Sequence, residues 1–281
     1  MRSLFLGLMA TLLVGCIAEE APKDIVNEQG EVVDDPTLLL NGLWDGQFDQ
    51  AGTLRVLIYN GNVFAFDEAT GYYGTVDLDD KTKLADITLE GYDFIDADTS
   101  AEQYVAGGLA EDYLLSGLLF SSSAENDTLV GDYETSTVGG SFSLTNDGTW
   151  ENNSALNAID GQWLSTGYEL YLTALSDRVT FKGISTDASG CTFNGAIRLL
   201  DKNQTLYQVE MTERKNCSEF NVVNAPGYAA VNVDGDLEFF IRKSDELLFM
   251  SFTPAATDTP TDTTTDTTTD TTTDTTTDTT I

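Results

Sequence analysis

The side chains best suited to chemistry in this sequence are carboxylates, which occur in three clusters. Calcium takes oxygen ligands at such spacings, and glycoside hydrolysis uses a pair of carboxyl groups. None of the clusters matches the twelve-residue EF-hand loop, and the sequence places no pair at a catalytic separation. We therefore interpret them as turn residues of an acidic chain, and we predict neither a catalytic residue nor a metal site. The clusters are Asp77, Asp79 and Asp80; Asp93, Asp96 and Asp98; and Asp234, Asp236 and Glu238.

The chain of 281 residues contains no histidine. This excludes catalysis by Ser-His-Asp or Cys-His groups and the usual zinc and copper sites. The sequence also has no Walker loop, GxGxxG motif or GxSxG motif. We therefore predict no cofactor and expect a protein that is not an enzyme.

The N-terminal segment has the three parts of an export signal. Arg2 supplies a positive charge, residues 4–14 form an apolar core, and Gly15 is a small residue directly before Cys16. The apolar core is too short for a membrane span, which needs roughly 20 residues.

The run Leu13-Val14-Gly15-Cys16 resembles the lipobox of bacterial lipoproteins. In that family the signal is cleaved before the cysteine, whose thiol receives a diacylglycerol. The resemblance implies that residues 1–15 are a signal peptide and that Cys16 is the lipid attachment site. In the same family an Asp after the cysteine favours the inner membrane, so Ile17 implies the outer membrane. A plain signal peptide is the alternative.

Two further cysteines remain, Cys191 and Cys217. Because an exported protein meets an oxidising compartment, we expect these two to form a disulfide. Closing a loop of this length would stabilise the fold by ~3.5 kcal/mol on the chain-entropy model. A pair of free thiols is the alternative.

The charge of the chain limits its partners. It has 47 acidic and 13 basic residues, with a formal net charge of −34. So acidic a surface repels phosphate backbones, which argues against a nucleic-acid partner. We expect the membrane as a partner through the lipid anchor, together with an envelope protein or a small apolar ligand.

Composition divides the mature chain into a tether, two β-rich halves and a tail. Residues 16–37 are acidic and weakly patterned, which predicts a flexible tether. The halves, 38–148 and 159–254, contain short apolar runs and are separated by a polar linker, 149–158. Residues 255–281 are a Thr/Asp repeat that cannot bury a core and is expected to be disordered. A glycosylated threonine brush is the alternative to a plain solvated tail.

Turn signals between the apolar runs predict antiparallel hairpins. Asn60-Gly61 favours a type I′ turn because both residues accept a positive φ, and Asp234-Gly235 gives a second hairpin signal. The stretch before Gly107-Gly108 is ambiguous. Ser100 and Gln103 could form a helix capping box, but the two glycines would end such a helix quickly.

The two halves begin alike. Leu40-Asn41-Gly42-Leu43-Trp44 matches Ile159-Asp160-Gly161-Gln162-Trp163 at an offset of 119 residues, and a similar order of strands follows each motif. We interpret this repetition as an internal duplication.

The shared apolar-x-Gly-x-Trp start resembles the first strand of lipocalin and avidin-type barrels. There the glycine lets the strand bend across the barrel floor, and the tryptophan closes that end. In lipocalins a late-strand arginine packs over the tryptophan, which implies this role for Arg242 over Trp163. A long antiparallel meander tends to close and so to remove its edges. We predict an all-β chain with two tandem, lipocalin-like barrels; an open sandwich is the alternative.

The second half is also similar to a set of uncharacterised proteobacterial lipoproteins. This resemblance supports the disulfide and the fold and implies no activity. The shared residues are Gly190, Cys191, Phe193, Gly195, Asn203, Tyr207, Cys217, Gly227 and Tyr228.

The large aromatic residues are expected to fill the barrels rather than to contact a ligand. Our leading hypothesis is therefore a lipid-anchored, non-enzymatic binding or interaction module of the cell envelope. The alternatives are a carrier of a small apolar ligand and, with less support, a carboxylate-based hydrolase. The expected core residues are Trp44, Trp163, Tyr168, Phe181, Phe193 and Phe239.

Overall fold

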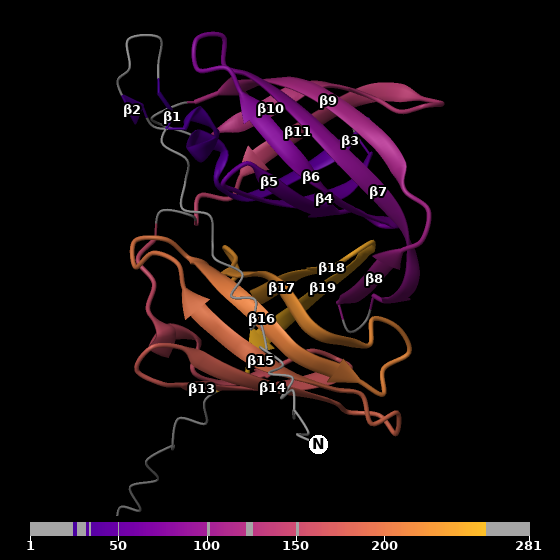
Figure 1. Ribbon diagram of the computed structural model, residues 1–281, viewed down its shortest axis with the longest axis vertical. Helices are drawn as coiled ribbons and strands as arrows, with labels where there is room; N and C mark the ends of the chain where they lie inside the picture. Colours follow the sequence, from indigo (N-terminus) through magenta and orange to yellow (C-terminus); the bar gives the residue numbers. More distant parts are fainter. Residues whose placement is uncertain are drawn as a thin grey trace, which may run out of the picture.

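The structure is a computed structural model that describes residues 25–26, 32–33, 35–49, 51–99, 102–121, 126–149 and 152–256. These residues form strands and two short 3-10 helices but no α-helix. The strands build two barrels that lie one above the other (Figure 1). The signal peptide, Cys16 and the Thr/Asp repeat from residue 257 lie outside the described residues. Within the predicted tether, β1 (Ile25–Val26) pairs with β2 (Val32–Val33).

Eight strands of the first half close a ring by antiparallel pairing. They pair in chain order, except that β7 pairs with β9 across β8, and β11 pairs with β3 to close the ring. Asn60 and Gly61 both have a positive φ in the turn between β4 and β5, which confirms that hairpin. The strands are β3 (Gly42–Phe48), β4 (Ala51–Tyr59), β5 (Asn62–Phe66), β6 (Thr70–Leu78), β7 (Leu84–Asp98), β9 (Glu111–Phe120), β10 (Thr128–Glu134) and β11 (Gly139–Asn146).

Eight strands of the second half form another ring in strict chain order. The ring closes where Trp163 and Leu164 of β12 pair with the end of β19. The predicted class, two tandem antiparallel meander barrels, is confirmed. The strands are β12 (Gly161–Leu164), β13 (Tyr168–Ala174), β14 (Val179–Ser185), β15 (Thr192–Leu199), β16 (Leu206–Lys215), β17 (Val222–Val231), β18 (Leu237–Lys243) and β19 (Glu246–Pro254).

One strand of the first half belongs to the sheet of the second. The end of β7 passes beyond its own barrel and pairs with β8 (Gln103–Gly107), which in turn pairs with β19. Figure 1 shows β8 beside the lower barrel. Val105 of β8 lies in the core of the second barrel. The ambiguous stretch before Gly107-Gly108 is therefore a strand and contains no helix in its described part, because pairing with β19 satisfies its backbone groups.

The motif that starts each half has the same geometry in both barrels. A 3-10 helix, η1 (Pro36–Leu40) or η2 (Leu156–Ile159), precedes a glycine of positive φ, 134° at Gly42 and 119° at Gly161. Two residues later the tryptophan indole donates a hydrogen bond to the last carbonyl of the 3-10 helix. The distance is 2.8 Å for Trp44 to Leu40 and 3.0 Å for Trp163 to Ile159.

Three apolar clusters form the core. Two fill the barrels, and the third lies between them. Buried members of the third cluster come from both halves, so the barrels share apolar contacts that neither half could bury alone. They are Leu43, Leu57, Phe64, Tyr92 and Ala106 from the first half, and Leu206, Ala230, Phe240, Leu247 and Phe249 from the second.

Arg242 does not pack over Trp163, so that expectation was wrong. Its guanidinium carbon lies 3.7 Å from the ring centroid of Tyr73, in the first barrel. The alternation of β18 explains this, because Phe239 and Ile241 point into the second barrel and Arg242 therefore points out of it.

Candidate functional site: the groove between the barrels

Both barrel interiors are occupied by side chains. Of the six aromatic residues predicted to be core, five are buried, and only Tyr168 is half-buried. Trp44 lies in the core of the first barrel and Trp163 in that of the second. Two described hollows lie elsewhere, one between the barrels and one at an end of the second barrel.

The hollow between the barrels is a groove of about 320 Å³. The first barrel contributes residues of β3, β4 and β5, and the second contributes the β17–β18 turn together with β18 and β19. The segment at β8 supplies the remaining wall. The groove is lined by Asp45, Arg55, Phe66, Glu102, Tyr104, Asn232, Val233, Asp234, Asp236, Glu238, Phe239, Phe240, Phe249, Met250 and Ser251.

Arg55 is the centre of the polar part of the groove. Its Nε donates to Oε2 of Glu238 at 2.9 Å, and its Nη1 donates to Oδ1 of Asp45 at the same distance. Nη2 lies 3.4 Å from Oδ2 of Asp147. The arginine side chain is only 11% exposed. Its buried charge is compensated by three carboxylates, which come from both halves of the chain.

Burial and pairing shift the pKa values of this network. Burial lowers the pKa of Arg55, but the carboxylates of Glu238, Asp45 and Asp147 raise it more, and the net shift is upward. Burial raises the pKa of Glu238 against the opposing effects of Arg55 and of a hydrogen bond from Asn232. Both oxygens of Glu238 thus accept bonds from fixed donors, which suits a structural ion pair better than a catalytic acid.

Aromatic rings form the apolar part of the groove. Tyr104 stacks on Phe66 with ring centroids 5.3 Å apart and on Phe94 at 5.2 Å. Phe66 also contacts Phe249 at 4.8 Å. Phe94 lies behind Tyr104 and does not line the groove. The lining rings Phe66, Tyr104 and Phe249 come from β5, β8 and β19, so both halves of the chain build the floor of the groove.

Three carboxylates of the groove have no basic partner within ion-pair distance in the described part of the chain. They are Glu102, Asp234 and Asp236. The two aspartates lie in the turn between β17 and β18, where the Asn232 side chain accepts the backbone N–H groups of Asp234 and Asp236. Our interpretation of this cluster as turn residues fits these bonds, and the turn also places its carboxylates at the groove.

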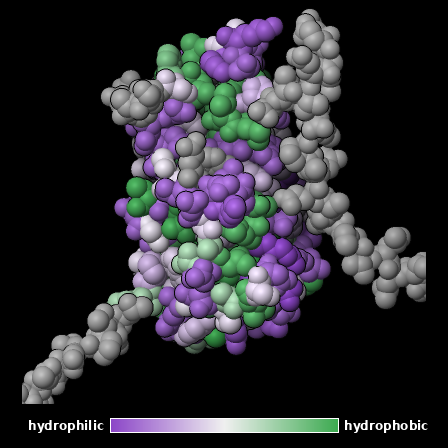
Figure 2. All heavy atoms as spheres, turned by 90° about the vertical axis from the view of Figure 1, so that its left-hand side faces the viewer, coloured by the Kyte–Doolittle hydropathy of each residue, from purple (hydrophilic) through white to green (hydrophobic). Residues whose placement is uncertain are grey.

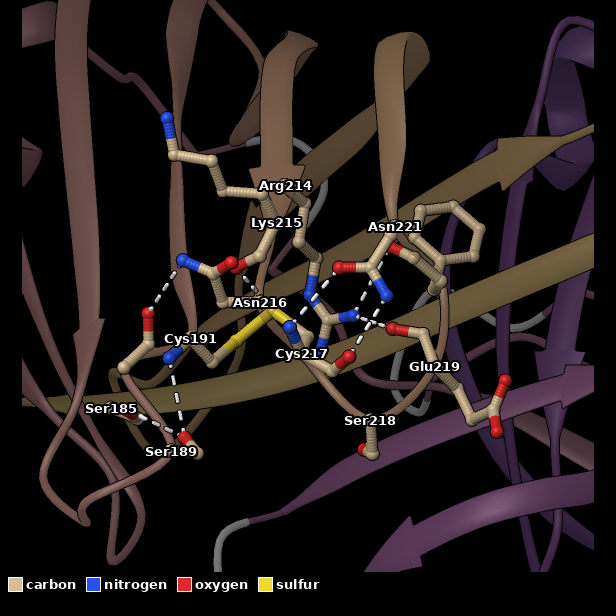
Figure 3. The surroundings of a disulfide bond; sticks show 12 residues. Ser185, Ser189, Cys191, Arg214, Lys215, Asn216, Cys217, Ser218, Glu219 and Asn221 are labelled. Atoms are coloured by element: carbon tan, nitrogen blue, oxygen red, sulfur yellow. Dashed lines mark hydrogen bonds between the residues drawn. A yellow bond between two sulfur atoms is a disulfide. The ribbon is translucent and has the colours of Figure 1, made fainter.

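The disulfide between Cys191 and Cys217 is present, as predicted (Figure 3). The loop after Cys217 supplies the backbone carbonyls of Glu219 and Phe220 to the guanidinium of Arg214. Arg214 is 1% exposed, burial lowers its pKa, and its Nη2 donates to Gln103 of β8 at 3.1 Å. The disulfide therefore holds the loop that ties the second barrel to β8.

The cluster of Asp77, Asp79 and Asp80 also has a structural role. Oδ1 of Asp79 accepts the backbone N–H groups of Lys81 and Thr82, and Asp80 pairs with Lys83 at 2.6 Å. Over the described ranges, no three or more carboxylate or thiol groups gather so as to hold a metal ion. No helix in that same portion of the chain has the length and apolar character needed to cross a bilayer.

The second hollow is a cleft of about 610 Å³ at the η2 end of the second barrel. Trp163 and Tyr207 line it together with polar residues such as Gln162 and Asp160. Trp163 is 5% exposed, whereas Trp44 is fully buried. The view in Figure 2 shows a largely hydrophilic surface with separate hydrophobic patches on both barrels.

No family model matches the chain, and no curated protein matches it.

Arg55 was missed by sequence reasoning, although a signal was present. It is one of only 13 basic residues and lies within the apolar run Leu54–Tyr59, where a charge needs a partner. Tyr104 and Glu102 gave no such signal, because the stretch that contains them could not be assigned to a strand from local pattern.

Proposed function

We propose that this protein is a lipid-anchored, non-enzymatic binding module of the cell envelope, and that it binds at the groove between its barrels. The observation that carries the proposal is the contrast between the two filled barrel cores and the open, mixed aromatic and charged groove. Ligand sites commonly combine apolar walls with a few placed polar groups at the junction of two domains. A ligand here would contact both halves at once.

Native mass spectrometry of the soluble mature chain, residues 17–281, purified from a periplasmic preparation tests this binding. Val233 lines the groove and is 65% exposed, so Val233→Trp should block the groove with little change to the core. Val223 is equally exposed on β17 outside the groove, which makes Val223→Trp the matched control. We expect a bound small molecule in the wild type and in the control but not in Val233→Trp. A bare mass in all three, or the same adduct in all three, contradicts the proposal.

The lipid anchor rests on the lipobox resemblance at Cys16 and on the export signal before it. Several acyl chains give stable anchoring, unlike a single chain. Cells that express the full chain should incorporate labelled fatty acid into it and retain it in the outer-membrane fraction, and Cys16→Ala should abolish both. Labelling that persists in Cys16→Ala would refute the anchor.

The internal duplication is part of the same proposal. The repeated 3-10 helix, positive-φ glycine and indole-to-carbonyl bond support it, because three independent features recur at equivalent positions. Two copies of one barrel, packed against each other, would have created a groove that neither copy contains.

A second candidate function is the carriage of a small apolar ligand, which the cleft beside Trp163 favours. Its signature is quenching of Trp163 fluorescence by an apolar ligand such as a fatty acid. The signal should vanish in Trp163→Phe and persist in Trp44→Phe. Quenching that is equal in both variants would exclude the cleft.

A further inference from the structure

One wall of the first barrel exposes apolar side chains next to one another. Leu84 of β7 lies opposite Leu118 of β9, and Leu118 lies opposite Val130 of β10. Directly opposite side chains on one face of a sheet have Cβ atoms roughly 5 Å apart, so these three are neighbours. Phe120 lies two positions beyond Leu118 on the same face of β9. These four side chains are 36–55% exposed, and we call them the apolar rim.

The apolar rim has a polar boundary toward the middle of the barrel. The next cross-strand row consists of Asp86, Ser116 and Asp132, and the hydroxyl of Ser116 donates to Oδ1 of Asp86 at 2.8 Å. Rows on one face of a sheet repeat every two residues, so this polar row lies about 7 Å from the row of Leu118. The row beyond it contains one exposed apolar side chain, Leu114, opposite Glu134. The wall is therefore apolar at its edge and polar from the next row inward.

The apolar rim lies at the end of the barrel where the tether enters. One cross-strand row runs from Phe120 through β10 and β11 to Asp45 of β3, close to the start of that strand. The helix η1, which precedes β3 and follows the tether, exposes Leu38 and Leu39 at the same end, by 36% and 51%. Figure 2 faces the side of the molecule on which β1 and β2 lie, and it shows hydrophobic surface on the upper barrel.

The apolar rim faces away from the second barrel. The opposite wall of the first barrel, built by β3, β4 and β5, contributes Leu43, Leu57 and Phe64 to the core between the barrels. In Figure 1, β9 and β10 lie on the upper side of the upper barrel, and β4 and β5 lie on the side toward the second barrel. A surface that contacts the rim therefore leaves the second barrel pointing away from it.

Apolar contact rather than charge selects the partner of the rim. The β6–β7 turn, which leads into Leu84, balances its charges with two acidic and two basic residues: Asp79, Asp80, Lys81 and Lys83. The chain as a whole is strongly negative, which disfavours an anionic surface. Apolar patches that polar residues surround mark sites of contact with proteins or membranes. Of these two, the entry of the tether at this end favours a membrane.

We propose that the apolar rim docks the first barrel onto the neutral phospholipid surface of the bilayer that holds the lipid anchor. This inference rests on the anchor at Cys16 in the proposed function. The chain from Cys16 to Asp35 can span at most about 65 Å, so the anchor keeps the rim at a high effective concentration near the bilayer. Interfacial apolar faces insert by about 5–10 Å. Insertion to this depth would bury the rim and leave the row of Asp86 and Asp132 among the polar headgroups.

Fluorescence quenching by brominated lipid tests this contact. The acylated full chain is reconstituted into vesicles of phosphatidylcholine that carries bromine on its acyl chains. Phe120→Trp places a reporter in the rim, and Val223→Trp places one on β17 of the second barrel, where Val223 is 65% exposed. After subtraction of the wild-type signal, we expect the fluorescence of Phe120→Trp to fall at least about twofold and that of Val223→Trp to change little, because only the rim reaches the acyl chains.

Removing two leucines of the rim provides a second readout. Leu84→Ser with Leu118→Ser, introduced into the Phe120→Trp chain, should abolish the quenching. The matched control is Leu164→Ser with Leu175→Ser, since these leucines of the second barrel are 39% and 44% exposed. This control should retain the quenching, and circular dichroism checks the fold of both double variants.

The lipid composition separates apolar docking from electrostatic attraction. Replacing part of the lipid by anionic phosphatidylglycerol should lower the quenching, because the chain has a net charge of −34. Equal quenching of the two reporters, no loss in the rim double variant, or stronger quenching on anionic lipid would overturn the proposal. Self-association of the soluble chain, residues 17–281, that disappears in Leu84→Ser with Leu118→Ser would assign the rim to a second copy of the chain instead. Analytical ultracentrifugation measures this self-association.

Docking and the lipid anchor can fail separately. A wild-type chain that incorporates no labelled fatty acid would refute the anchor. An acylated chain whose Phe120→Trp fluorescence is not quenched would retain the anchor and refute the docking of the rim.

Discussion

Arg55 of the first barrel and Glu238 of the second are joined by an Nε–Oε2 bond of 2.9 Å across 183 positions of sequence. The bond is shielded, because the side chains are only 11% and 13% exposed. Together with the β7–β8 pairing to β19 and the shared apolar cluster, it makes the two barrels one unit. The groove exists only because the two barrels pack together, since residues of both barrels line it.

Replacing Arg55 should strongly lower the free energy of unfolding. Arg55→Ala leaves Glu238 and Asp147 as buried carboxylates without their cation, and we expect a loss of about 3–5 kcal/mol in the free energy of unfolding. Arg55→Lys keeps the charge but loses the planar set of donors, so its loss should be smaller. Urea denaturation followed by circular dichroism measures both. The control is Arg178→Ala, whose exposed pair with Asp177 at 3.8 Å should contribute less than about 1 kcal/mol. Equal losses for Arg55→Ala and Arg178→Ala would refute the role of Arg55.

Removing the disulfide should lower the stability of the fold. The bridge spans 26 positions, and Cys191→Ser with Cys217→Ser should lower the free energy of unfolding by about 3.5 kcal/mol on the chain-entropy model. Hydrogen exchange should rise first in the loop that holds Arg214. A loss below about 1 kcal/mol, or exchange that is unchanged in this loop, would show that the loop is held without the bridge.

Substitution of the glycine that starts the second barrel should destabilise the fold because its backbone has a positive φ. Gly161 has a φ of 119°, and a Cβ added there would meet no other atom within 4 Å. Gly161→Ala should therefore cost about 1–3 kcal/mol through backbone strain alone. The neighbouring exposed residue provides the control, since Gln162→Ala should change thermal stability little. A tolerated Gly161→Ala would mean that the strand start does not need this conformation.

Tyr133 should ionise at a higher pH than an ordinary tyrosine. Its hydrogen bond to Asp49 and, next, its burial raise the pKa of the phenol from 10.0 to about 12. A raised pKa means that the contribution of Tyr133 to stability is present below pH 10 and is lost as the pH rises through about 12. The phenolate absorbance of the wild type minus that of Tyr133→Phe should show one transition near 12.

The acceptor of that bond offers a second variant. Asp49→Asn removes the negative charge beside the phenol, so the pKa of Tyr133 should fall back toward 10.0. Tyr92, whose pKa is raised to about 12 by burial and by Glu90, should be unaffected and serves as the internal reference. A transition of Tyr133 that remains near 12 in Asp49→Asn would exclude Asp49 as its cause.

Local signals were enough to predict much of the fold. Asn60-Gly61 specifies a hairpin through two residues that accept a positive φ, and the Gly-x-Trp motif predicts both barrel starts. Cys191 and Cys217 were expected to pair because of the compartment. The hairpin and the barrel starts depend on a few residues close in sequence. The disulfide could be predicted because only two cysteines remain once Cys16 is assigned to the lipid.

The groove could not be predicted in the same way. β8 looks irregular by itself because its partner, β19, lies some 140 positions later, and only that pairing makes it a strand. A charged residue such as Arg55 within an apolar strand predicts an acidic partner. The sequence does not show that this partner is Glu238, because three clusters of acidic residues were equally available. Arg242 was misplaced because a resemblance to lipocalins assigned it to the barrel interior, whereas the second barrel turns that position toward the first.

The most direct test of the account is whether the two barrels open together. Hydrogen exchange of the full mature chain at increasing urea, resolved by mass spectrometry, can follow β4 of the first barrel and β14 of the second. The account predicts that both strands lose protection at the same urea concentration, because the barrels share a core, a strand and the Arg55–Glu238 pair. If β14 keeps its protection after β4 has lost it, or the reverse, the barrels are independent units and the groove is not a fixed site.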